Sequence, residues 1–114
     1  MTAAVVVVGT SLGGFSGLQV LLSGLPKEFP LPLIVVQHRG RAADDTPAKL
    51  LGAQSALLVS EPNDQESLKP GHLYVAPAQC HLLVEPGSLA LSTAAPVNYA
   101  RPSIDVLFES AARA

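Results

Sequence analysis

Ser11 lies in a glycine-rich segment that could make it a nucleophile. It occupies the centre of a Gly-x-Ser-x-Gly pattern that runs from Gly9 to Gly13. In α/β enzymes this pattern forms a sharp turn between a buried strand and a helix, and the turn exposes the serine hydroxyl. The backbone N–H of Leu12 would then be placed to stabilise an oxyanion, so the segment predicts acyl-transfer chemistry.

Two other interpretations of this segment are open. Ser11 could act only as the N-cap of the following helix, a role that serine often fills. A glycine-rich turn can also hold a phosphate, but residues 9–14 lack the Gly-x-Gly-x-x-Gly spacing and the Lys-Ser/Thr pair of phosphate loops. The segment alone therefore does not decide between a nucleophile and a helix cap.

His38 is the candidate general base. It follows the apolar run Leu33–Val36 as Ser11 follows the run of valines, and both runs are typical of strands buried on two faces. If the two strands are parallel neighbours, their carboxyl ends meet at the edge of the sheet where α/β proteins bind ligands. An imidazole there can take the proton of the serine hydroxyl and return it to a leaving group.

The remaining polar residues give weaker signals. His72, Cys80 and His81 are too few for a zinc site of three or four ligands, so no metal is expected. Cys80 is interpreted as a small, buried or half-buried side chain rather than a reactive thiol. The charged residues after His38 are interpreted as a solvated loop that could contact substrate; they are Arg39, Arg41, Asp44 and Asp45.

A serine-histidine pair also needs a carboxylate that orients the imidazole. The aspartates of the chain are Asp44, Asp45, Asp64 and Asp105. None of them follows a third buried strand at its carboxyl end. Asp105 is expected in the first turn of a helix, where a negative charge interacts favourably with the helix dipole.

The elements that would position these residues are those of an α/β fold. Strands are predicted over residues 5–8, 33–36, 56–59, 73–77, 81–85 and 89–92, the last two as a β-hairpin. Helices are predicted from Phe15 onward, around residues 47–51 with Pro47 in the first turn, and after Ser103. Ser103 is the expected cap of the last helix, and Ile104, Leu107 and Phe108 are expected on its apolar face. Short strands joined by helical crossovers predict a doubly wound, mainly parallel sheet with helices on both faces. No strand follows the last helix, so we expect a domain that is incomplete at its C-terminus.

Composition excludes several classes of function. The 114 residues carry seven Lys and Arg side chains and a net charge of −2, which gives no basic surface for nucleic acid. The single cysteine, Cys80, excludes an intramolecular disulfide and favours a reducing compartment. We see neither a signal peptide nor an apolar stretch of about 20 residues, so a cytoplasmic protein is expected.

Four ordered motifs resemble the catalytic domain of CheB-type protein-glutamate methylesterases of bacterial chemotaxis. The motifs are Gly9–Gly14, Val35–His38, Lys69–Pro77 with His81–Leu82, and Pro96–Phe108. The match runs through essentially the whole chain, and four motifs in order are far more specific than the serine motif alone. On this resemblance residues 1–114 are the N-terminal portion of such a catalytic domain, with no receiver domain.

The resemblance implies an activity and its residues. It implies a serine hydrolase that demethylates γ-glutamyl methyl esters, and can deamidate glutamines, on methyl-accepting chemotaxis receptors. Ser11 matches the nucleophile and His38 the base of a Ser-His-Asp triad that uses no cofactor. The family's aspartate lies in a later segment that this sequence does not contain, so we expect the chain to be nearly inactive. An inactive receptor-binding module is the alternative, and control by a receiver domain in trans is left open.

Overall fold

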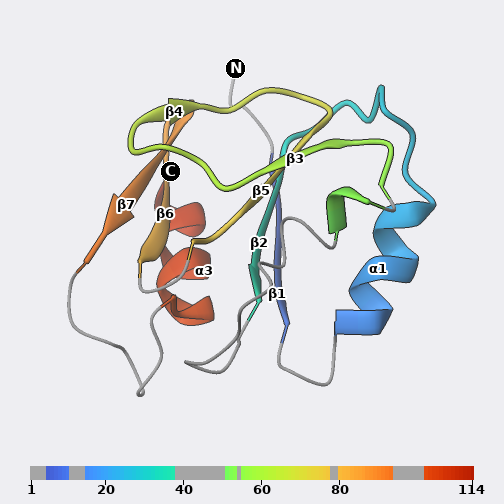
Figure 1. The fold of residues 1–114 in the computed structure, drawn as a ribbon. Helices are drawn as coiled ribbons and strands as arrows, with labels where there is room; N and C mark the ends of the chain where they lie inside the picture. Colours follow the sequence, from blue (N-terminus) through green and yellow to red (C-terminus); the bar gives the residue numbers. More distant parts are fainter. Residues whose placement is uncertain (1–4, 11–14, 38–50, 54, 78–79, 94–101) are drawn as a thin grey trace.

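A four-stranded parallel sheet forms the centre of the protein (Figure 1). The computed structural model describes residues 5–10, 15–37, 51–53, 55–77, 80–93 and 102–114. The strands are β1 (Val6–Thr10), β2 (Leu33–Gln37), β3 (Leu58–Ser60) and β5 (His72–Val75), in the spatial order β1-β2-β5-β3. All their pairings are parallel, as the strand and helix pattern predicts.

A smaller antiparallel sheet lies beside the parallel one. It contains β4 (Glu66–Ser67), β6 (His81–Glu85) and β7 (Ser88–Ser92), in the order β4-β7-β6. Strands β6 and β7 form the predicted hairpin, and Gly87 in its turn has a φ of 77°, a value that side chains other than glycine rarely adopt. The side chain of Asp64 supports this sheet, because its Oδ1 accepts a hydrogen bond of 2.9 Å from the Leu91 N–H.

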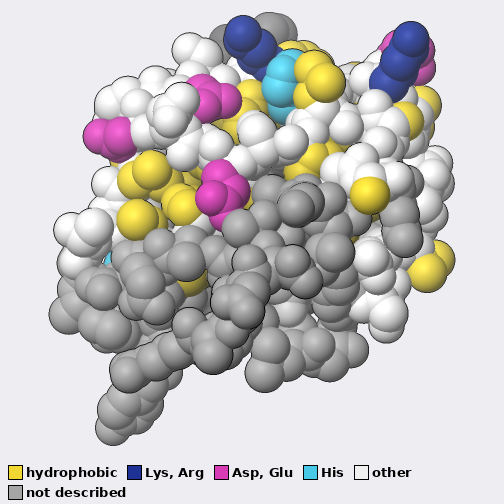
Figure 2. Space-filling view, in the orientation of Figure 1, with side chains coloured by type: hydrophobic (Ala, Val, Ile, Leu, Met, Phe, Trp, Pro, Cys, Tyr) yellow, Lys and Arg dark blue, Asp and Glu magenta, His cyan; other side chains and the backbone are white. Residues whose placement is uncertain are grey.

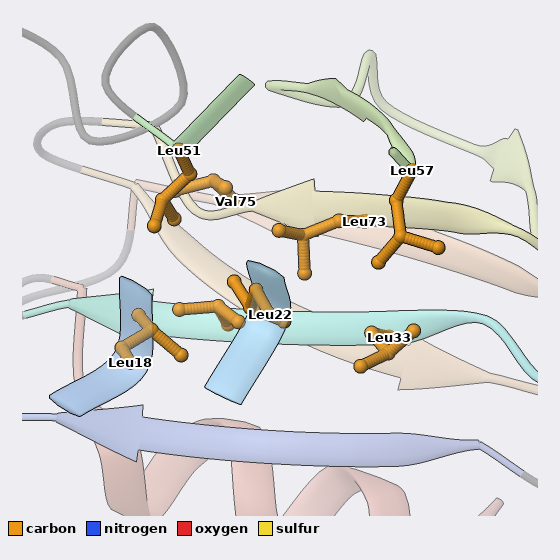
Figure 3. Packing of buried hydrophobic residues seen from close by; sticks show 8 residues of the cluster. Leu18, Leu22, Leu33, Leu51, Leu57, Leu73 and Val75 are labelled. Atoms are coloured by element: carbon orange, nitrogen blue, oxygen red, sulfur yellow. The ribbon is translucent and has the colours of Figure 1, made fainter. Parts of the chain in front are cut away.

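Helix α1 (Phe15–Ser23) covers one face of the parallel sheet. Leu18 and Leu22 of this helix pack on Leu33, Leu73 and Val75 of the strands, as Figure 3 shows. Leu51 and Leu57 close the same cluster, in which every member is at most 5% exposed. Burial of side chains of this size stabilises a fold by about 1.5–3 kcal/mol each.

The opposite face of the sheet is covered by helix α3 (Ile104–Arg113) and by the antiparallel sheet. Ile34 and Val36 of β2 point to this side, where they join Tyr74 and Leu107. Adjacent residues of β2 thus enter different clusters, because side chains alternate along a strand. Both faces of β2 are buried, which confirms a doubly wound arrangement with helices on the two sides of the sheet.

Some sequence predictions need correction at the level of single residues. The third strand is Leu58–Ser60 rather than 56–59, and its Leu58 is 65% exposed while the preceding Leu57 is buried. On α3, Phe108 was expected on the apolar face but is 44% exposed. The buried stripe of α3 runs through Leu107 and Ser110 instead, so Phe108 lies one helical step beyond it. The predicted helix after Pro47 lies mostly outside the described residues.

Candidate active site

Strands β1 and β2 end side by side at the edge where the sequence predicts a site. Their parallel register pairs Gly9 with Val36. It also pairs Thr10, the last residue of β1, with Gln37, the last residue of β2. Ser11 and His38 are the next residues of the two segments. Both of them, and Leu12, lie outside the described residues, so the structure establishes the neighbouring strand ends and not the positions of these side chains.

Strand β5 reaches the same edge from the other side of β2. Val75 pairs with Val35, and the N–H of Ala76 donates a hydrogen bond of 2.9 Å to the Val35 carbonyl. Gln37 is only 5% exposed although it is polar and ends its strand. The carboxyl edge of the sheet is therefore well ordered by backbone pairing up to the residues before the candidate nucleophile and base.

The first turn of α3 packs on the end of β1. A Cβ atom placed on Gly9 would overlap Ile104 Cγ2 and would lie 2.9 Å from Ile104 Cγ1. Carbon atoms at van der Waals contact are about 3.5–4.0 Å apart, so no larger side chain fits between β1 and α3 at this position. The turn that the sequence predicts after Gly9 falls on residues 11–14, outside the described residues; in the structure Gly9 makes room for helix α3.

A buried histidine holds the start of this helix. His81 is 2% exposed, and its Nδ1 accepts a hydrogen bond of 3.2 Å from the Ser103 N–H. Ser103 is the N-cap of α3, as predicted, because its Oγ accepts from the Val106 N–H. An Nδ1 that accepts carries no proton, so a neutral His81 has its proton on Nε2. The sequence placed His81 in a predicted strand and in a motif of the family resemblance, but its contact with Ser103 was not predicted; the apolar strand pattern that follows it was the available sign of burial.

The other residues considered from the sequence lie at different places in the fold, and some lie outside the described residues. His72 begins β5 and is therefore at the amino edge of the sheet, where its Nδ1 lies 3.0 Å from the Pro70 carbonyl oxygen. Cys80 is partly buried, and Asp105 is in the first turn of α3. The charged segment after His38 lies outside the described residues; its members are Arg39, Arg41, Asp44 and Asp45.

The described residues give no sign of a metal site, and the face drawn in Figure 2 shows no strongly charged patch. They contain no group of three His, Cys, Asp or Glu side chains that could hold a metal ion. On the face drawn in Figure 2, the described basic and acidic side chains are scattered among hydrophobic and neutral ones. Among the helices of the described segments, none is long and apolar enough to cross a membrane.

Comparisons with known proteins agree on one family. Residues 6–114 match the family model described as CheB methylesterase. A protein-glutamate methylesterase/protein-glutamine glutaminase of Anaeromyxobacter dehalogenans is 43% identical over 109 residues, which are 96% of this chain and 32% of that protein. A Leptospira interrogans relative is 38% identical over 112 residues, which are 97% of this chain and 58% of the relative.

A solved structure shows the same fold. The crystal structure of the Thermotoga maritima CheB methylesterase catalytic domain matches with a TM-score of 0.88 and 35% identity. The match covers 99% of this chain and 62% of that one. The predicted α/β fold is thereby confirmed, and the chain spans less than two thirds of the length of the proteins it resembles.

Proposed function

Since the chain belongs to the CheB methylesterase family, we propose that residues 1–114 form the N-terminal portion of a serine hydrolase domain. Its substrates are γ-glutamyl methyl esters of chemoreceptors in the cytoplasm, and glutamine side chains of the same receptors are a second substrate. The observation that carries this proposal is the parallel pairing of Thr10 with Gln37. It supports a common site for Ser11 and His38, because each follows one of these paired residues.

The reaction follows from the chemistry of these two side chains. The Ser11 hydroxyl oxygen attacks the ester carbonyl carbon while His38 accepts its proton. The Leu12 N–H donates a hydrogen bond to the oxyanion that forms on the carbonyl oxygen. The intermediate then collapses, the imidazolium returns the proton, and methanol leaves. Water hydrolyses the acyl-serine by the same route in reverse and leaves a free glutamate side chain.

The orienting carboxylate is proposed to come from outside these 114 residues. Two of the four aspartates have other roles in the structure: Asp64 Oδ1 accepts a hydrogen bond from the Leu91 N–H, and Asp105 lies in the first turn of α3, where its charge interacts favourably with the helix dipole. The other two lie outside the described residues. Loss of the orienting carboxylate lowers turnover by about 10⁴-fold in serine hydrolases. We therefore expect residues 1–114 alone to be nearly inactive.

Methanol release from a methylated chemoreceptor tests this proposal. The 114-residue chain is compared with an extended protein, in which residues 1–114 are continued by the C-terminal remainder of the Thermotoga maritima catalytic domain. Circular dichroism checks that each protein is folded. We expect the extended protein to release methanol and the 114-residue chain to be slower by about three orders of magnitude or more.

Two outcomes would contradict the proposal. Equal rates from the two proteins would show that no carboxylate outside residues 1–114 is needed. An extended protein that is folded and binds the receptor but releases no methanol would instead identify an inactive receptor-binding module.

A further inference from the structure

We propose that Ile104 is a positioning residue of the active site, which sets the end of β1 by packing on Gly9. The inference rests on the proposed function, because it concerns the strand end that precedes Ser11. Gly9 and Ile104 are far apart in the sequence, and their contact joins β1 to the first residue of α3. The contact lies two residues before the candidate nucleophile.

The packing of Ile104 on β1 leaves no room for a side chain on Gly9. A Cβ on Gly9 would meet three atoms of one side chain, Ile104 Cγ2, Cγ1 and Cδ1. The first two branch directly from Cβ of Ile104, so a change of the outer torsion angle alone does not relieve the overlap. Rotation about χ1 is also restricted, because a β-branched residue in a helix strongly prefers one rotamer.

Helix α3 is held in place and cannot easily withdraw. At its start, the Ser103 N–H donates to His81 Nδ1; one turn from its end, Ser110 Oγ accepts a hydrogen bond of 2.8 Å from the Val84 N–H. Both partners belong to β6. Between these two hydrogen bonds, Leu107 is 0% exposed and packs in the hydrophobic cluster that contains Ile34, Val36 and Tyr74 of the parallel sheet.

A side chain larger than hydrogen at position 9 must therefore displace β1 rather than α3. In the part of the chain that the structure describes, β1 is paired with β2 only, so it is the less constrained of the two partners. A misplacement of about 1 Å in a catalytic group can lower a rate by about 100-fold. Gly9 thus serves the serine motif by letting Ile104 fix the strand, and Ile104 acts through Ser11 without touching substrate.

The test is a double-mutant cycle in the extended protein with Gly9→Ala, Ile104→Ala and both together. We expect Gly9→Ala to lower kcat for ester hydrolysis by about tenfold or more, with KM changed less than threefold. Ile104→Ala removes the atoms that collide with the new Cβ, so the double variant is expected to recover most of the lost kcat. The matched control is Gly17→Ala, because a Cβ at Gly17 meets no atom within 4 Å.

A second readout uses the 114-residue chain and does not depend on activity. Gly9→Ala is expected to shift the amide resonances of Thr10 and Gln37, and Ile104→Ala in the same chain is expected to reverse the shifts. The inference is overturned if Gly9→Ala keeps kcat within twofold of the parent, or if Ile104→Ala does not restore it. Ser11→Ala separates the two proposals: full activity in that variant refutes the proposed function, whereas its inactivity beside an active Gly9→Ala refutes only the positioning role.

Discussion

Ser110 shows how single polar side chains secure this fold. Its Oγ accepts a hydrogen bond from the Val84 N–H and donates one of 2.7 Å to the Leu107 carbonyl, and the residue is only 8% exposed. A buried N–H without a partner costs as much as its lost solvation, so the hydroxyl is needed even though it lies on the packed face of a helix. His81 does the same for the Ser103 N–H.

Substitution of Ser110 by alanine is expected to lower the free energy of unfolding by about 1–3 kcal/mol, because it leaves the Val84 N–H unsatisfied. The higher helix propensity of alanine offsets about 0.5 kcal/mol of this loss. Urea unfolding measures the change. The control is Ser23→Ala, which removes an exposed hydrogen bond to the Val20 carbonyl and is expected to change stability by less than about 0.5 kcal/mol. Equal effects of the two substitutions would contradict this account of Ser110.

Tyr74 makes the stability of the protein sensitive to alkaline pH. The residue is 0% exposed, and its hydroxyl donates to the Ser67 carbonyl and accepts from the Lys69 N–H, both at 3.0 Å. Burial raises the pKa of the Tyr74 phenol above its ordinary value of 10.0, the Lys69 hydrogen bond opposes the rise, and the charge of Glu66 adds to it. The folded state therefore prefers the neutral phenol more strongly than the unfolded chain does.

The sign of the effect follows from this preference. Below the unfolded pKa the phenol is neutral in both states and its contribution to stability is complete; as pH rises through the folded pKa, that contribution is lost. Near pH 8 we expect Tyr74→Phe to lower the free energy of unfolding, because the substitution removes two hydrogen bonds. Between about pH 8 and about pH 11, however, the variant is expected to lose less of its free energy of unfolding than the parent protein does. Urea unfolding at both pH values measures this, and the other groups that titrate there cancel in the comparison. An equal alkaline loss in both proteins would contradict it.

At the scale of elements, two glycines with similar φ angles differ in what surrounds them. Gly71, just before β5, has a φ of 74°, and Gly87 in the β6–β7 turn has a φ of 77°. A Cβ on Gly71 would lie 2.6 Å from the Lys27 carbonyl oxygen, whereas a Cβ on Gly87 would meet nothing within 4 Å. Only Gly71 brings the segment between α1 and β2 against the amino end of β5.

The two alanine substitutions separate backbone strain from steric overlap. Gly87→Ala is expected to cost about 1–2 kcal/mol, the cost of a left-handed conformation for a residue with a Cβ. Gly71→Ala carries the same strain and the overlap with Lys27, so it is expected to cost about 1–3 kcal/mol more. Thermal or urea unfolding compares the two. Losses that agree within error would show that the contact with the Lys27 carbonyl can relax freely.

The elements themselves were largely predictable because local sequence determines them. Leu33–Val36 has no polar residue, and the strand it forms is buried on both faces. Ser103 could be recognised as a cap because capping involves only the next three residues. The pairing of β1 with β2 followed from the length of the helical crossover, and it supports the predicted site through its last pair, Thr10 and Gln37.

The contacts that sequence reasoning missed all join distant parts of the chain. Ile104 on Gly9 and His81 on Ser103 are tertiary contacts, and no periodicity over a short window encodes them. Phe108 was misplaced for a related reason: its apolar character suggested burial, but the position of α3 on β6 selects Leu107 and Ser110. Ser110 lies on the packed face although it is polar, because its hydroxyl satisfies the Val84 N–H there.

At the scale of the whole molecule, the described elements border one side of the proposed site. The ends of β1 and β2 are paired at its centre, and β5 lies next to β2. Helix α3 packs on β1 through the contact of Ile104 with Gly9. The chain covers 62% of the Thermotoga maritima catalytic domain, so a complete domain of this family has further segments that this sequence does not include. This division explains why residues 1–114 hold the proposed nucleophile and base and are expected to lack their full reactivity.

The most direct test of the central claim is covalent labelling of the extended protein with a fluorophosphonate. The serine oxygen attacks phosphorus, fluoride leaves, and the histidine accepts the serine proton, so the reaction needs the proposed pair and no natural substrate. We predict that peptide mapping will locate the label on Ser11, and that His38→Gln will slow labelling by about 100-fold or more. A label on another residue, or an unchanged rate in His38→Gln, would contradict the assignment of Ser11 and His38 as nucleophile and base.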